Sequence, residues 1–184
     1  PDGRSGSPHL RTWRDGWRHL RFMLLYSPRW LFLYPGFALM AIGLFIGFWL
    51  LPGPQTVGGV TFDVHTLLYG AMLVLVGFQA VTFSVFTKVF GVNAGLLPVD
   101  RRLEKLWRYF TLERGLLIGG VLLLLGMLGT LSALHLWSVE LFGPLEPTTV
   151  LRIVIPAILA VVVGLQTILA SLFLSILRLD RRRH

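Results

Sequence analysis

The 184-residue chain contains no cysteine and only nine acidic residues, against 17 Lys and Arg. Without cysteine it can form no disulfide, thiolate zinc site or cysteine nucleophile. The carboxylates are scattered, and the five histidines do not cluster at metal-ligand spacing. HExxH, GxSxG and P-loop patterns are absent from the sequence. We therefore predict no catalytic residue, no metal site and no cofactor within this chain.

Apolar sequence is abundant instead: 54% of the residues are hydrophobic, and the mean hydropathy is +0.71. Four apolar runs are each long enough to cross a hydrocarbon core of about 30 Å. They cover residues 30–51, 64–90, 115–137 and 150–177. We expect an all-α integral membrane protein whose four transmembrane helices form two hairpins.

The net charge of +8 is unevenly placed. Lys and Arg lie in or beside the N-terminal segment, residues 91–114 and the tail, and Arg152 is the exception. The short loops 52–63 and 138–149 carry no Lys or Arg. The positive-inside rule then predicts that both termini and the middle loop are cytoplasmic. This placement favours an anionic lipid bilayer as the partner, and not nucleic acid.

Two of the basic segments have the pattern of amphipathic helices that lie at a membrane surface. The first begins at residue 8 and leads into the first span, and Ser27-Pro28 before that span resembles an N-cap followed by a first-turn proline. The second follows a candidate N-cap, Asp100. Their apolar stripes are Leu10, Trp13, Trp17, Leu20 and Leu24 in the first, and Leu103, Leu106, Trp107 and Phe110 in the second.

Residues 77–86 (GFQAVTFSVF) and 164–173 (GLQTILASLF) share Gly, Gln, Ser and Phe without gaps. The similarity indicates either a duplicated unit of interfacial helix plus hairpin or chance likeness between low-diversity membrane segments. Gln79 and Gln166 need polar partners inside a membrane. They could line a lipid or substrate groove, but we favour an interhelical hydrogen bond, which could join the two repeats.

Arginines that precede the first and third spans are candidate ligands of a lipid phosphate, because a guanidinium fork matches phosphate geometry. The simpler alternative is general anchoring on anionic lipid. The candidates are Arg18, Arg21, Arg29, Arg101, Arg102, Arg108 and Arg114.

Other motifs predict structural roles. Gly43-x-x-x-Gly47 and Gly115-x-x-x-Gly119 are helix-packing patterns. We expect Asp63 to cap the second span and Glu113 to lie in the first turn of the third. An outer proton or metal site made by Asp63 and His65 is a weaker alternative.

Several motifs resemble bacterial family 2 glycosyltransferases, the polyprenyl-phosphate (dolichol-phosphate-like) sugar transferases. Residues 15–22 (DGWRHLRF) and 26–29 (YSPR) resemble the junction between the catalytic and membrane domains of these enzymes, and the pattern continues with residues 77–79 (GFQ) and 111–115 (TLERG). The resemblance implies a cytoplasmic GT-A-type catalytic domain before Pro1 that uses a divalent metal (Mg or Mn). It also implies that residues 3–6 (GRSG) correspond to a Gly-x-Ser-basic pattern. Arg4 and Ser5 would then lie near the nucleotide phosphates, although Gly6 replaces the basic residue.

The resulting division is a junction with a juxtamembrane helix (1–29), a hairpin (30–90), an interfacial loop (91–114), a second hairpin (115–177) and a basic tail (178–184). We expect a fragment that anchors a glycosyltransferase and positions its polyprenyl-phosphate acceptor in the bacterial plasma membrane. Its own catalytic domain and a second copy are the other expected partners. The alternatives are a four-span accessory or flippase-like protein for lipid-linked sugars, and a structural anchor that forms oligomers through glycine faces.

Overall fold

The computed structural model describes Trp13, Gly16, Trp17, residues 29–97 and 111–139, Leu141, Gly143 and residues 146–180, with only the backbone for residues 178–180. Within these residues, four helices are long and apolar enough to cross a membrane: Arg29–Leu50, Val64–Asn93, Leu112–Val139 and Pro147–Leu177. The four predicted spans are thereby confirmed, and each helix ends within about three residues of its predicted limits.

The first span begins as a π-helical turn, η1 (Arg29–Leu33), and continues as α2 (Tyr34–Leu50). Pro35 lies in the first turn of α2. Proline has no N–H to donate to a carbonyl one turn earlier, so a wider turn can form just before it. Pro52 follows the last residues of α2, where proline disfavours continued α-helix.

A two-stranded antiparallel ribbon joins α2 to α3 (Val64–Asn93). Its strands are β1 (Gln55–Val57) and β2 (Val60–Phe62), and Gly58 and Gly59 between them both have positive φ. A two-residue turn with positive φ at both positions matches the right-handed twist of paired strands. The sequence analysis treated this stretch as a loop, so the all-α prediction needs this small correction.

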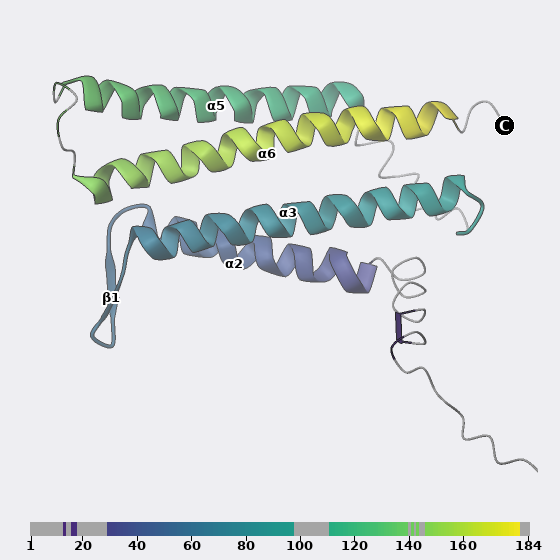
Figure 1. Cartoon of the computed structure of the whole chain (residues 1–184), viewed down its shortest axis with the longest axis horizontal. Coiled ribbons are helices and arrows are strands. Elements are labelled where there is room, and N and C mark those ends of the chain that lie inside the picture. Colours follow the sequence, from purple (N-terminus) through teal and green to yellow (C-terminus); the bar gives the residue numbers. More distant parts are fainter. Residues whose placement is uncertain are drawn as a thin grey trace, which may run out of the picture.

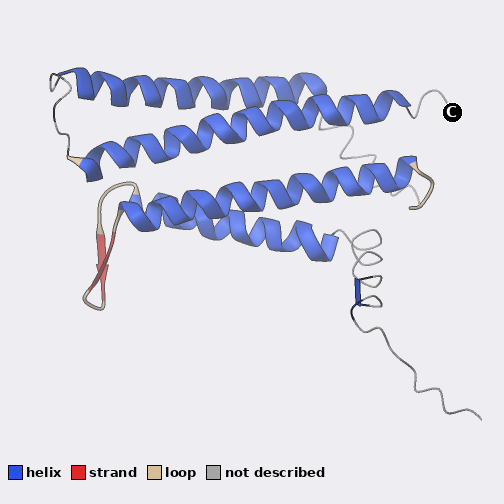
Figure 2. Ribbon diagram, viewed as in Figure 1, coloured by secondary structure: helices blue, strands red, loops and turns tan. Residues whose placement is uncertain are grey.

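The helices pair as the predicted hairpins: α2 packs along α3, and α5 (Leu112–Val139) packs along α6 (Pro147–Asp180). The hairpins meet mainly where α3 contacts α6. Figure 1 shows all four helices side by side, with α2 and α5 both finishing at the end that carries the ribbon. We call this end the turn end, and Figure 2 shows the ribbon there as the two strands.

Small residues bring the helices of each hairpin close together. A methyl group on Gly36 would come within 2.8 Å of the Gly77 carbonyl oxygen, and one on Gly119 within 2.7 Å of the Gly164 carbonyl oxygen. Seven residues further along α2 and α5 the same kind of contact recurs, because seven residues are about two turns and return to the same face. The four facing pairs are Gly36 with Gly77, Gly43 with Gly70, Gly119 with Gly164, and Gly126 with Ala157.

The predicted glycine-packing patterns are confirmed in part. Gly43, Gly115 and Gly119 all face a neighbouring helix, whereas a methyl group on Gly47 would meet nothing within 4 Å. Most large apolar side chains point outward, as expected for helices surrounded by lipid. The interfacial helices predicted at residues 8–28 and 99–110 fall mainly or wholly outside the described residues, and the orientation across the membrane stays a prediction.

Candidate functional site

Within the part of the chain that the structure describes, polar contacts join the two hairpins at the turn end, near the middle and at the opposite end, and apolar clusters lie beside the contacts at the two ends. At the turn end Arg152 contacts the first hairpin next to a cluster of Leu50, Val64, Leu67 and Ile155. Near the middle, Gln166 contacts Gln79. At the opposite end, the Asn93 side-chain amide donates to the Leu177 carbonyl oxygen at 2.8 Å, beside a cluster around Val89 and Val92.

The Gln166 amide nitrogen donates to Oε1 of Gln79 at 3.0 Å, across 87 positions of sequence. This is the interhelical hydrogen bond that the sequence analysis favoured. The rings of Phe86 and Phe173, separated by the same interval, meet edge to face with centroids 4.7 Å apart. When equivalent residues contact each other, the two units are related by an approximate two-fold axis.

This axis supports the duplication and not chance likeness. Ala157 and Gly164 of α6 follow Gly70 and Gly77 of α3 at the same interval as the glutamines, and all four face the preceding helix of their own hairpin. Because both hairpins turn at the same end, the axis runs along the helices (Figure 1). Repeats related in this way occur in membrane proteins as parallel repeats.

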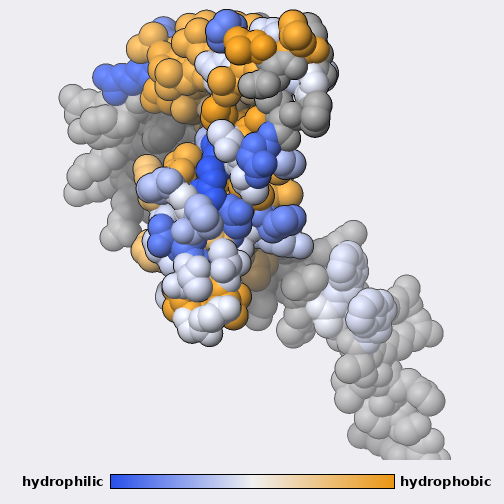
Figure 3. Space-filling model, turned by 90° about the vertical axis from the view of Figure 1, so that its left-hand side faces the viewer, coloured by the Kyte–Doolittle hydropathy of each residue, from blue (hydrophilic) through white to orange (hydrophobic). Residues whose placement is uncertain are grey.

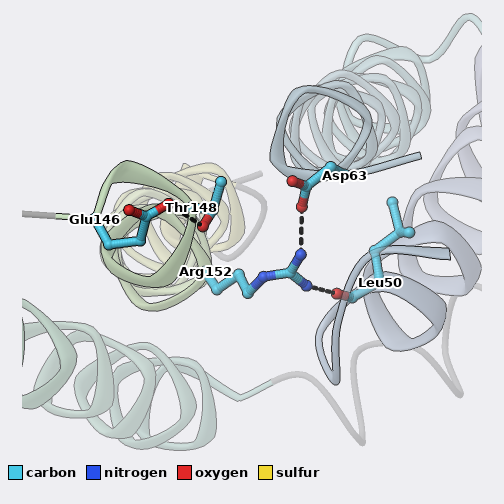
Figure 4. Close-up of polar contacts among 5 residues, drawn as sticks. All are labelled: Leu50, Asp63, Glu146, Thr148 and Arg152. Atoms are coloured by element: carbon cyan, nitrogen blue, oxygen red, sulfur yellow. Dashed lines mark hydrogen bonds and ion pairs between the residues drawn. The ribbon is translucent and has the colours of Figure 1, made fainter. Parts of the chain in front are cut away.

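At the turn end Arg152 extends from α6 toward the place where α2 ends and α3 begins (Figure 4). One guanidinium nitrogen donates to Asp63 Oδ1 and another to the Leu50 carbonyl oxygen. The side chains of Arg152 and Asp63 are 15% and 26% exposed. Hydrophilic residues gather around the middle of this end of the molecule in Figure 3.

The predicted side-chain cap by Asp63 is wrong. Asp63 occupies the N-cap position of α3, but its carboxylate makes no cap hydrogen bond. Its backbone carbonyl accepts from the Thr66 and Leu67 amides, while its carboxylate faces Arg152. An ionised guanidinium is a stronger partner than a backbone amide. Among the described residues, no three His, Cys, Asp or Glu side chains gather as metal ligands, at Asp63 and His65 or elsewhere.

Sequence reasoning did not assign a role to Arg152. A signal was present, since Arg152 is the lone base outside the basic segments and Asp63 is an acid in the opposite outer loop. An arginine near a helix end inside a membrane protein usually pairs or reaches the interface. That pattern could have predicted the pair, but not the bond to Leu50.

At the end opposite the turns, two candidate phosphate ligands fall among the described residues. Arg29 begins η1 and is half-buried, and Arg114 lies exposed in the first turn of α5. Glu113 lies in that turn as predicted, and the Arg114 backbone amide donates to Thr111 Oγ1 at 3.4 Å. Arg18, Arg21, Arg101, Arg102, Arg108, Arg4 and Ser5 lie outside the described residues.

Residues 85–178 match the model of the glycosyltransferase family 2 C-terminal transmembrane region. The chain belongs to this family. The region therefore covers the end of α3, all of α5 and nearly all of α6. The family resemblance stated from the sequence motifs is confirmed.

The chain is also 39% identical over 177 residues to the low-salt glycan biosynthesis hexosyltransferase Agl6 of Haloferax volcanii. The alignment covers 94% of this chain but 40% of that relative, so this chain spans well under half of the relative's length. No solved structure matches the chain. The relative is archaeal, and the bacterial origin expected from the sequence stays a prediction.

Proposed function

We propose that this chain is the membrane-anchoring and acceptor-lipid-positioning part of a hexosyltransferase that transfers a sugar from a nucleotide-sugar to polyprenyl phosphate. The observation that carries the proposal is the 39% identity, over nearly the whole chain, to a relative named as a hexosyltransferase. The family match to a glycosyltransferase transmembrane region supports the same assignment.

The chemistry of the reaction explains why such a domain is needed. A polyprenyl phosphate keeps its apolar tail in the bilayer and its phosphate at headgroup depth, whereas a nucleotide-sugar is water-soluble. Arg29 and Arg114 lie at the starts of two spans, at the end predicted to be cytoplasmic. Guanidinium groups there would hold the phosphate where the sugar arrives, and such positioning can lower a barrier by several kcal/mol.

The transfer step itself is assigned to a catalytic domain that precedes Pro1 and uses Mg or Mn. In this proposal, Arg4 and Ser5 lie near the nucleotide phosphates, and both termini are cytoplasmic. The flippase-like alternative depended on Gln79 and Gln166 lining a path for lipid. Their hydrogen bond to each other supplies a structural reason for both residues, so the transferase reading is preferred.

The test is binding of polyprenyl phosphate to the 184-residue chain in nanodiscs, measured by native mass spectrometry. We expect Arg29→Gln and Arg114→Gln each to weaken binding, and Arg→Lys changes at the same positions to restore part of it, because lysine keeps the charge without the fork. The unphosphorylated polyprenol is the matched control and should bind equally weakly to every variant. Unchanged phosphate binding in both glutamine variants would overturn the site assignment.

A further inference from the structure

The side of α2 that packs against α3 repeats every seven residues. Gly36, Gly43 and Leu50 lie on this side and are all buried. A step of seven residues back along α2, from Gly43 to Gly36, moves the facing residue on α3 forward by seven, from Gly70 to Gly77. This is the relation expected for two antiparallel α-helices, and it predicts what the next step back would bring into the interface.

The next step of seven residues reaches Arg29. If residues 29–50 formed one uninterrupted α-helix, Arg29 would lie on the same side as Gly36, because seven residues make about two turns. It would then face Ser84 and Lys88, which lie seven residues beyond the two α3 residues that Gly36 faces. Ser84 is only 3% exposed. The guanidinium would therefore be directed into the interface between the helices, toward a second cation and away from the surrounding lipid.

The π-helical turn η1 changes this register. A π-turn closes an i→i+5 ring and holds about one residue more than an α-turn, so it rotates the preceding residues by about 100° around the helix. The exposures agree with this rotation, since Gly36 is buried whereas Arg29 is half-buried and Trp30 is 75% exposed. Phe32 makes the contact with α3 instead, and its ring meets that of Phe83 edge to face with centroids 4.9 Å apart.

The second hairpin shows what happens without a proline at this place. Gly119 of α5 corresponds to Gly36 of α2, since each faces the equivalent glycine of the following helix. Ile118 therefore stands where α2 has Pro35, and this part of α5 is regular α-helix from Leu112 onward. Proline lacks the N–H of an α-helical hydrogen bond, and its ring clashes with the carbonyl four residues earlier. The wide turn thus accompanies the proline and is absent from the equivalent helix that lacks it.

We infer that Pro35 is a positioning residue for the acceptor-lipid site: the wide turn that it imposes rotates Arg29 out of the α2–α3 interface, to where its guanidinium can receive a lipid phosphate. The inference rests on the proposed function, in which Arg29 holds the phosphate of polyprenyl phosphate. A guanidinium fork binds phosphate well only when it is presented in the right orientation. Pro35 itself contacts no phosphate, and it acts through the register of Arg29.

The first test is binding of polyprenyl phosphate to the 184-residue chain in nanodiscs. Loss of one hydrogen-bonded charge contact in Arg29→Gln should weaken binding about tenfold or more. Pro35→Ala restores the N–H and removes the ring, so it should weaken binding by a similar factor. The combined variant should bind no more weakly than Arg29→Gln alone, because both changes remove the same contact. Pro156→Ala, the same substitution inside α6, is the matched control and should leave binding unchanged.

The second test measures the register without any ligand. The chain has no cysteine, so Arg29→Cys and Lys88→Cys can be introduced together and oxidised in liposomes. With Pro35 present, the rotation keeps these two positions apart, and we expect little disulfide. Adding Pro35→Ala should bring them face to face and give a disulfide within the chain. Equal disulfide formation with and without Pro35→Ala, or none in either case, would overturn the change of register.

The two tests separate failure of the inference from failure of the proposed function. If Arg29→Gln weakens phosphate binding but Pro35→Ala does not, the positioning role of Pro35 is wrong and the phosphate site stands. If Arg29→Gln leaves binding unchanged, the assignment of Arg29 to the acceptor site is wrong, and the positioning role falls with it. The disulfide result then still decides whether Pro35 sets the register of the first span.

Discussion

Arg152 in α6 bonds through one guanidinium to Asp63 at the start of α3 and to the Leu50 carbonyl oxygen at the end of α2. A single side chain of the second hairpin thus joins both ends of the connection in the first. The contact has no counterpart in the repeat register, because His65 stands where Arg152 would be and Val150 where Asp63 would be. The Arg152 contact therefore joins the two hairpins in a way that breaks their approximate symmetry.

Arg152→Gln should destabilise the fold. The substitution leaves a partly buried carboxylate and a helix-end carbonyl without their cationic donor, and we expect a loss of about 1–3 kcal/mol. Unfolding in detergent, followed by circular dichroism against SDS fraction, measures it. Glu146→Gln at the same end is the control and should change stability by no more than about 0.5 kcal/mol. A wild-type midpoint for Arg152→Gln would show that the pair adds nothing.

Gly43 and Gly47 of α2 give a matched test of the hairpin contact. A methyl group on Gly43 would lie within 3 Å of the Gly70 carbonyl oxygen and of the Val74 backbone, which cannot move cheaply. We expect Gly43→Ala to cost about 1–3 kcal/mol. Gly47→Ala meets nothing within 4 Å and should stabilise the helix by about 0.5–1 kcal/mol. The same unfolding measurement distinguishes the two variants. If Gly43→Ala and Gly47→Ala changed the stability equally, that result would contradict the close approach of α2 and α3 at Gly43.

Local sequence patterns predicted much of this fold, because in a bilayer the local sequence largely determines which segments form spanning helices. A run of apolar residues must be helical to satisfy its backbone in lipid, so all four spans could be found from hydropathy alone. The equivalent positions of Gln79 and Gln166 in the two repeats likewise predicted that the two side chains hydrogen-bond to each other. In contrast, the search for glycines four residues apart found only part of the packing, since the contacts follow a seven-residue interval such as Gly36 and Gly43.

Contacts between distant residues explain what the sequence analysis missed. Whether the Asp63 carboxylate caps its own helix or pairs with Arg152 depends on a residue 89 positions away. The ribbon was missed for a local reason, because residues 52–63 were treated as a loop and Gly58-Gly59 was not considered as a two-residue turn. Most candidate phosphate ligands lie outside the described residues, so the acceptor site still depends on sequence and chemistry.

The membrane orientation can be tested by labelling engineered cysteines in intact cells. Val57 on β1 is 55% exposed at the turn end, and Leu96 after α3 is 51% exposed at the opposite end. If the positive-inside prediction holds, an impermeant maleimide should label Val57→Cys from outside and Leu96→Cys only after permeabilisation. The reversed pattern would place the termini outside and remove the basis for a cytoplasmic acceptor site.

The ring contact between Phe86 and Phe173 tests whether the hairpins meet along the predicted axis. Aromatic pairs with this geometry contribute about 0.5–1.5 kcal/mol beyond the area that they bury. A double-mutant cycle with Phe86→Leu and Phe173→Leu should therefore give a coupling energy in that range. Phe45→Leu combined with Phe173→Leu is the control, because Phe45 stacks on Trp49 within α2 and should show no coupling to α6. Zero coupling between Phe86 and Phe173 would mean that α3 and α6 do not meet face to face at this depth, and the approximate two-fold axis would then rest on the glutamine pair alone.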